Sequence, residues 1–96
     1  MRRAARADDN QAEVVKALRA IGAEVTHLHR LGGGVCDLLV SFRQRWLCME
    51  VKDGSKPPSE RRLTPDEQAW IGRQKAAVYI VNSPGEAVRL ALDIRP

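Results

Sequence analysis

The stretch "VCDLLVSFRQRWLCMEVK", residues 35–52, contains two runs of strand-forming residues joined at Arg43 and Gln44. Branched and aromatic side chains are frequent in both runs, and a two-residue connection between such runs is typical of a β-hairpin. A hairpin with this turn pairs residues that lie equally far from it, which places Asp37 directly opposite Glu50. The stretch therefore predicts antiparallel strands that bring two carboxylates together.

The two carboxylates predict a charged site on one face of the sheet. Side chains alternate between the faces of a strand, so Glu50 shares its face with Lys52, and the register adds Asp37. Carboxylates opposite each other lie roughly 5 Å apart, and they repel by about 1 kcal/mol in water and several times more near a protein surface. A shared proton, the lysine, or a hard cation such as Mg²⁺ or Mn²⁺ can offset this repulsion. A structural acid–lysine pair on an exposed face is the plainer alternative.

A helix and a strand are expected before the hairpin. Residues 8–22 place their aliphatic side chains on one side of a helix, which Asp8 or Asp9 can cap and Gly22 can end. Residues 23–31 alternate as a strand does, and three glycines follow them.

The pattern after the hairpin predicts a loop, a helix, a strand and a final helix. Residues 52–63 contain two prolines and several charges, which indicates a loop. Thr64 and Glu67 have the spacing of a capping box, with proline at the first helical position. A buried strand over residues 76–81 and a helix over residues 83–92 follow. Hairpins first and a helical crossover afterwards predict an α/β fold, a mixed sheet in the order α-β-β-β-α-β-α flanked by helices.

The composition indicates one ordered domain. A chain of 96 residues that is 44% hydrophobic is expected to form a single domain, residues 1–96, with a modest core. The net charge of +4 favours an acidic partner such as nucleic acid. No apolar run has the length of a membrane span, and the amino end leads into a charged helix rather than a signal peptide. We therefore expect a cytoplasmic protein with no membrane contact.

The cysteines and histidines predict no zinc site. Cys36 and Cys48 are too few for a disulfide framework or a zinc quartet, and the predicted register places them on opposite faces. We therefore expect two buried free thiols. His27 and His29 share one face of the expected strand but lack companions at zinc-like spacing, so we expect structural or surface roles for them.

Three short motifs along the chain carry a family resemblance. They are Gly34-Val35-Cys36-Asp37-Leu38, Glu50-Val51-Lys52, and LTPDEQAW at residues 63–70. In this order and on these elements, they resemble the PD-(D/E)XK nucleases, in particular the small stand-alone VRR-NUC domains of viral and bacterial genomes. The family often has proline where this chain has Cys36, a position that shapes the backbone and does not bind the metal. The resemblance implies a restriction-endonuclease-like core and a metal-dependent nuclease.

The resemblance implies a role for each residue of the central motif. Asp37 and Glu50 would bind Mg²⁺ or Mn²⁺ through carboxylate oxygens, and the carbonyl of Val51 would complete the protein ligands. Such a metal lowers the pKa of a bound water and neutralises charge in the transition state. Lys52 would orient that water or stabilise the transition state, because acting as a base would require a pKa far below its usual value of about 10.4. A simple counter-ion is the alternative for Lys52.

Two helical residues join the predicted site by the same resemblance. Glu13 lies at the margin of the apolar stripe of the first helix, where the family places a glutamate that approaches the metal. Gln68 shares a helix face with Ile71, so we expect it to point toward the sheet. The alternatives are a solvated helix residue for Glu13 and a hydrogen bond to a neighbouring loop for Gln68.

Basic residues on the loop before the second helix are candidates for contacts with a nucleic-acid backbone. They are Lys56, Arg61 and Arg62, and the amino end adds Arg2, Arg3 and Arg6. Simple solvation is the alternative for such a charged loop. No motif that reads bases is visible, so we expect recognition of shape more than of sequence.

The sequence and the resemblance together predict a metal-dependent endodeoxyribonuclease that hydrolyses phosphodiester bonds in duplex or branched DNA, without an organic cofactor. One active site cuts one strand, so cutting both strands requires two copies, and a homodimer is expected on these grounds and by family analogy. The rival is a non-catalytic nucleic-acid-binding module that keeps the nuclease fold. A small interaction protein with exposed acidic strands is a third possibility, which no specific feature supports.

Overall fold

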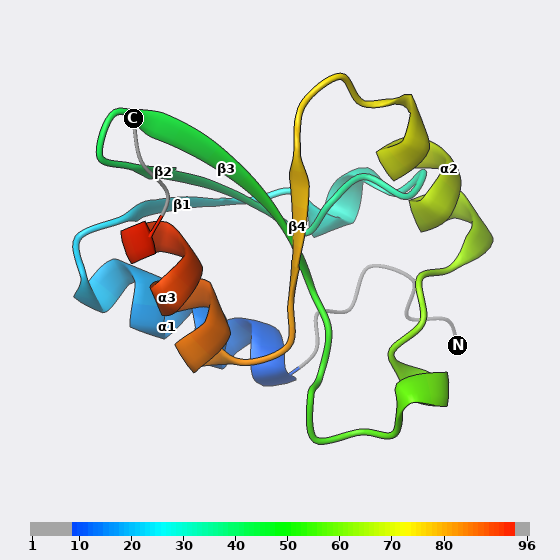
Figure 1. Cartoon of the computed structure of the whole chain (residues 1–96), viewed down its shortest axis with the longest axis horizontal. Coiled ribbons are helices and arrows are strands. Elements are labelled where there is room, and N and C mark those ends of the chain that lie inside the picture. Colours follow the sequence, from blue (N-terminus) through cyan, green and yellow to red (C-terminus); the bar gives the residue numbers. More distant parts are fainter. Residues whose placement is uncertain (1–8, 94–96) are drawn as a thin grey trace.

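Four strands form one mixed sheet in the order β1-β2-β3-β4 (Figure 1). The computed structural model describes residues 9–93, which form three α-helices, four strands and two short 3₁₀ turns. The helices and strands are α1 Asp9–Ala20, β1 Glu24–His27, β2 Leu38–Phe42, β3 Arg45–Val51, α2 Pro65–Arg73, β4 Val78–Val81 and α3 Pro84–Asp93. The 3₁₀ turns are η1 His29–Leu31 and η2 Pro58–Glu60. The α/β class, the mixed sheet and the order of the elements are confirmed.

The turn between β2 and β3 determines the register of the hairpin. Arg43 and Gln44 have positive φ angles of 52° and 70°. Such left-handed angles at both central residues define a type I′ turn, whose twist matches that of the paired strands. The pairing that follows from this turn extends to Leu38 opposite Met49. The predicted register is therefore confirmed along all of β2.

The crossover after the hairpin makes the sheet mixed. β4 pairs with β3 in parallel, and parallel neighbours need a long connection, which here contains η2 and α2. Figure 1 shows α1 and α3 packed side by side on one side of the sheet, whereas α2 stands at the opposite end of the molecule. After β3 the chain passes through η2 at the lower edge of the view in Figure 1 and then rises into α2.

The core lies between the sheet and the layer formed by α1 and α3. Alternate residues of β3 point into it, and α1 adds the stripe of aliphatic residues that the helical periodicity predicts. The buried hydrophobic residues from these two elements are Val14, Val15, Leu18, Leu47, Met49 and Val51. Gly22, with a φ of 95°, ends α1 as predicted. Among residues 9–93, no helix has both the length and the apolar character to cross a membrane.

The first strand is shorter than predicted. β1 ends at His27, and His29 lies in the 3₁₀ turn η1. Between them Leu28 has helical backbone angles, with φ −114° and ψ −7°, and its N–H donates to the carbonyl of Asp37 at 2.7 Å. The prediction of a strand through residue 31, with both histidines on one strand face, is therefore wrong beyond His27.

Cys36 and Cys48 form a disulfide, so the prediction of free thiols is wrong. The error lies in extending the alternation of β2 backward, because β2 begins at Leu38 and the chain bends at Asp37. Because Cys36 precedes this bend, the strand alternation of β2 does not determine the direction of its side chain, which reaches Cys48. The disulfide thus links the residue before Asp37 to the residue two positions before Glu50.

Reduction of this disulfide is expected to lower the free energy of unfolding by about 3 kcal/mol, because the bridge restricts the unfolded chain. Its cysteines are separated by 12 positions in sequence. Urea unfolding with and without dithiothreitol measures the effect. A double variant with serine at both positions serves as the control and should not respond to the reductant. Equal stability of the wild-type protein with and without reductant would contradict the bridge.

Candidate functional site

Asp37, Glu50 and Lys52 meet where β3 ends. The N–H of Val51 donates to Oδ2 of Asp37 at 2.8 Å, which joins the bend before β2 to the last residue of β3. Glu50 is almost fully buried, at 2% exposed, and its Oε2 lies 3.6 Å from Nζ of Lys52. The type I′ turn at the other end of the hairpin produces this meeting, because it determines which residues of the two strands face each other.

Glu67 is a fourth charged member of the cluster, and the sequence reasoning missed it. Its Oε1 lies 2.8 Å from Nζ of Lys52, closer than the carboxylate of Glu50. The sequence explained Glu67 fully as the capping-box partner of Thr64, a role that the structure confirms. The available signal was its place in the first turn of α2, directly after the polar loop that follows Lys52.

Gly34 allows α2 to approach the hairpin. Its φ is +83°, and a Cβ atom here would overlap the backbone carbonyl of Asp66 and lie 2.8 Å from the N of Glu67. Any other residue would therefore push the start of α2 away. Since α2 has no buried residue of its own, this close approach helps to hold Glu67 near Lys52.

Burial controls the electrostatics of the cluster. It raises the pKa of Glu50 to about 9, together with a hydrogen-bonding interaction with Glu67 and the charge of Asp37. Burial also raises the pKa of Asp37, although the hydrogen bond from Val51 opposes it. Burial alone would raise the pKa of Glu67 too, but its hydrogen bonds with Lys52 and Glu50 lower it. Around neutral pH, Glu50 thus carries a proton and Glu67 is a carboxylate.

Lys52 keeps its charge in this environment. Burial alone would lower its pKa, but the carboxylates of Glu67, Glu50 and Asp37 raise it above the usual value. An ammonium with a raised pKa is a poor general base and a good source of positive charge. The geometry therefore favours an electrostatic or orienting role for Lys52.

The donor set suits a hard divalent cation. Oε1 of Glu50 is buried and has no hydrogen-bond partner among the described residues. The carbonyl of Val51 points to the same side of its strand as its N–H, hence toward Asp37. Carboxylate and carbonyl oxygens are the ligands that Mg²⁺ and Mn²⁺ prefer. Within residues 9–93, no group of three or more acidic, histidine or cysteine side chains is already arranged around a metal position.

The structure does not bring Glu13 or Gln68 into this cluster. Glu13 is exposed on α1, and the polar residue on the buried side of that helix is Gln11, whose Nε2 lies 3.2 Å from Nδ1 of His29. Gln68 is exposed and donates to the carbonyl of Leu63 at 3.3 Å. That bond is the alternative foreseen for Gln68, and a role for either residue in catalysis stays a prediction.

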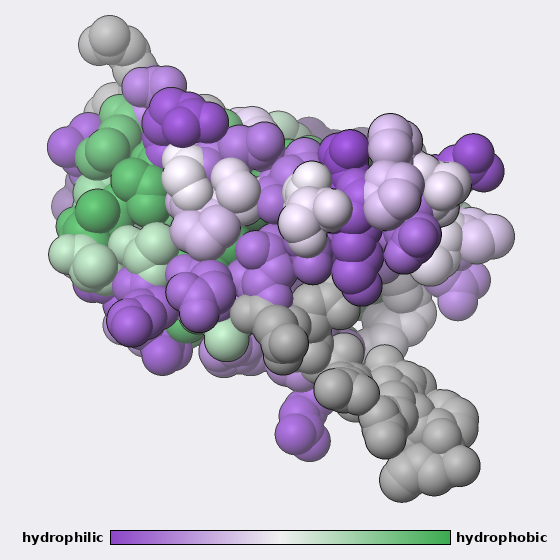
Figure 2. Space-filling view, turned by 90° about the horizontal axis from the view of Figure 1, so that it is seen from below, coloured by the Kyte–Doolittle hydropathy of each residue, from purple (hydrophilic) through white to green (hydrophobic). Residues whose placement is uncertain are grey.

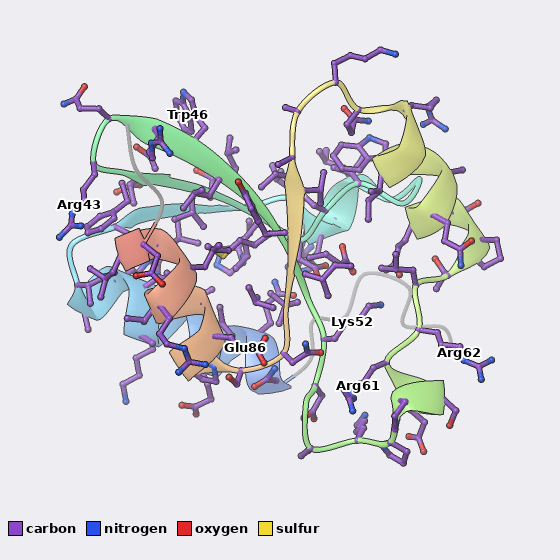
Figure 3. All side chains as sticks on the ribbon, in the orientation of Figure 1. Arg43, Trp46, Lys52, Arg61, Arg62 and Glu86 are labelled. Carbon is purple, nitrogen blue, oxygen red and sulfur yellow. A yellow bond between two sulfur atoms is a disulfide. The ribbon has the colours of Figure 1, made fainter. Side chains whose placement is uncertain are left out.

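The basic residues of the loop lie beside the cluster. Figure 3 shows Arg61 and Arg62 on the same side of the molecule as Lys52, with Arg43 and Trp46 at the far end of the hairpin. Nε of Arg61 donates to the carbonyl of Lys56 at 2.8 Å, which orders the loop, and Lys56 and Arg62 are exposed. In the view from below, hydrophilic side chains cover much of this end, whereas apolar ones gather at the opposite end (Figure 2). The predicted cap at Asp8 or Asp9 and the arginines at positions 2, 3 and 6 lie outside the described side chains.

The cluster as a whole combines the protonated Glu50, the carboxylate of Glu67, the carboxyl group of Asp37 and the ammonium of Lys52 at the edge of a hydrophilic surface. Such a group can bind a dication on its oxygens and present a positive charge to a phosphate. When the chain was compared with models of protein families, with curated proteins and with solved structures, none of them matched it.

Proposed function

We propose that the chain is a Mg²⁺- or Mn²⁺-dependent endonuclease of the PD-(D/E)XK type, which hydrolyses phosphodiester bonds in duplex or branched DNA. The observation that carries the proposal is the meeting of Asp37, Glu50 and Lys52 at the end of β3, with an unpartnered oxygen on Glu50. A buried glutamate with no partner for one oxygen costs stability unless a cation can occupy the site. A functional role explains why this cost is kept.

Each residue has a defined part in this proposal. Asp37, Glu50 and the carbonyl of Val51 would hold the metal, which supplies Lewis-acid chemistry by lowering the pKa of a water and neutralising phosphate charge. The ammonium of Lys52 would donate hydrogen bonds to that water or to a phosphate oxygen and would keep its proton throughout. Glu50 must lose its proton before its carboxylate can act as a ligand.

The surroundings of the cluster support a nucleic-acid substrate. Lys56, Arg61 and Arg62 lie on the loop that leaves the cluster, where they can contact phosphates on either side of the bond to be cut. The described part of the chain carries one such cluster, so cutting both strands requires two copies, and we propose a homodimer for that activity. We expect recognition of DNA shape rather than sequence.

A cleavage assay tests the proposal. Supercoiled plasmid and a four-way junction are incubated with the protein in Mg²⁺, in Mn²⁺ or in EDTA, and the nicked and linear products are measured. Cleavage that requires the metal supports the proposal, and cleavage that survives EDTA contradicts it. Binding to either DNA without any cutting would instead support a non-catalytic nucleic-acid-binding module. Sedimentation of the protein on the junction measures whether one or two copies bind.

A further inference from the structure

Glu67 contacts two separate segments through one oxygen. Its Oε1 accepts the N–H of Thr64 at 2.8 Å and lies 2.8 Å from Nζ of Lys52. The first contact is half of a capping box, completed by the N–H of Glu67, which donates to Oγ1 of Thr64 at 3.1 Å. The box holds the carboxylate in one orientation, because the backbone of Glu67 is bonded to the side chain of Thr64 and its Oε1 is bonded to the N–H of Thr64. The oxygen that meets Lys52 is therefore positioned by the start of α2.

The carboxyl groups of Glu67 and Glu50 both lie near the single ammonium of Lys52. Glu67 lies at hydrogen-bond distance, whereas Oε2 of Glu50 is 3.6 Å away. Only the shorter contact has the geometry of a charge-assisted hydrogen bond. The side chains of Lys52 and Glu67 are 14% and 18% exposed, so water screens the pair only partly. The ammonium is thus held mainly from α2, and not by the carboxylates expected to bind the metal.

The contact between Lys52 and Glu67 becomes more important when a dication occupies the site. A dication on Asp37 and Glu50 would repel the neighbouring ammonium and would neutralise the attraction that Glu50 exerts on it. Without another partner, the flexible side chain of Lys52 would turn outward to water. Glu67 provides that partner, because its Oε1 lies 2.8 Å from Nζ of Lys52 and it belongs to α2 rather than to the pair expected to hold the metal.

We propose that Glu67 is a positioning residue that holds the ammonium of Lys52 beside the Asp37–Glu50 pair. Its consequence for catalysis rests on the proposed function, whereas the ion pair can be tested without any activity. The close approach of Gly34 to the start of α2 brings Glu67 within reach of Lys52. The first turn of α2 is thus part of the site through Glu67, one position before the glutamine that the family resemblance singled out.

Two variants separate positioning from helix capping. Glu67→Gln keeps a side chain that can complete the capping box but removes the charge that pairs with Lys52. Thr64→Val removes the hydroxyl that caps α2 but leaves the Glu67 carboxylate in place. The chain has only four lysines, Lys16, Lys52, Lys56 and Lys75, so the nitrogen–proton NMR signals of their ammonium groups can be assigned. Circular dichroism identifies a temperature at which both variants are folded.

The expected spectrum shows a Lys52 ammonium signal, protected from exchange with water, in the wild-type protein and in Thr64→Val. In Glu67→Gln the signal is lost or exchanges with water much faster than in the wild-type protein, because a neutral amide oxygen accepts a weaker hydrogen bond from the ammonium than a carboxylate does. In the cleavage assay we expect Glu67→Gln to lower kcat about 10–100-fold with little change in KM, the loss typical of residues that orient a catalytic group. Thr64→Val should change kcat by less than about three-fold, since it leaves the pair intact.

A Lys52 signal that is unchanged in Glu67→Gln overturns the proposal, and so does a signal lost equally in Thr64→Val. An unchanged kcat in Glu67→Gln, with the signal lost, overturns the catalytic consequence. If the signal behaves as expected but no form of the protein cuts DNA, the ion pair stands and the nuclease proposal fails. The two failures are therefore distinguishable.

Discussion

Replacement of Asp37 by asparagine is expected to abolish metal-dependent DNA cleavage, with a loss of kcat of about 10³-fold or more. Asparagine has the size of aspartate and keeps an oxygen that can accept the N–H of Val51, the bond of 2.8 Å at the end of β3. It lacks the negative charge that a hard dication requires of its ligands. The variant therefore removes the proposed metal ligand while it preserves the local hydrogen bond. Cleavage of supercoiled plasmid in Mg²⁺ or Mn²⁺ measures the loss.

Asp53→Asn is the matched control. It makes the same change of charge at a residue near the cluster, whose carboxylate accepts hydrogen bonds only from Ser55 among the described residues. We expect its rate to stay within about two-fold of the wild-type rate, because surface charges act weakly through water. A rate for Asp37→Asn above a tenth of the wild-type rate, or an equal loss in the control, would contradict the assignment of Asp37 as a ligand.

The register of the hairpin could be predicted because few residues determine it. Two runs of strand-forming residues and a two-residue connection leave one pairing that keeps the apolar side chains of β3 in the core. That pairing also places Asp37 and Glu50 together, so the centre of the candidate site followed from local sequence. The capping box of α2 was predictable for the same reason, since it depends on Thr64 and Glu67 alone.

The errors lie where the backbone leaves the regular pattern. The alternation of residues 23–31 continues through Leu28, but the chain there takes helical angles and ends β1. The bend at Asp37 likewise separates Cys36 from the alternation of β2 and lets it reach Cys48. The alternation of apolar and polar residues indicates a strand, but it does not indicate where a single residue bends the backbone.

Glu67 shows a different limit of sequence reasoning. The capping box alone explains a glutamate at this position, so there was no reason from the sequence to expect a second contact. In the structure, Oε1 of Glu67 contacts both the N–H of Thr64 and Nζ of Lys52. The second contact depends on how closely α2 approaches the hairpin, and that approach depends on Gly34. Contacts between segments that are distant in sequence require the tertiary structure, and neither propensity nor spacing predicts them.

In EDTA, the Glu50→Gln variant is expected to be more stable than the wild-type protein at neutral and alkaline pH. The pKa of Glu50 is about 9 in the folded chain, against an ordinary value of 4.5. The folded chain therefore holds a proton on Glu50 in a pH range where the unfolded chain has lost it. The stability contributed by this proton is fully present below pH 4.5 and is lost as the pH rises toward 9. At pH 7 the loss is about 3 kcal/mol of the free energy of unfolding. Glutamine is neutral in both states and removes this loss.

Urea unfolding at pH 4, 7 and 9 measures the difference between the two proteins. We expect similar stability at pH 4 and an advantage of the Glu50→Gln variant that grows with pH, since only the wild-type protein must release a proton on unfolding. Glu24→Gln, on the exposed side of β1, is the control and should follow the wild-type curve. Added Mg²⁺ should raise the stability of the wild-type protein and leave that of the Glu50→Gln variant nearly unchanged, because a bound dication replaces the proton on the carboxylate. Parallel pH curves for Glu50→Gln and wild type would contradict a buried, protonated Glu50.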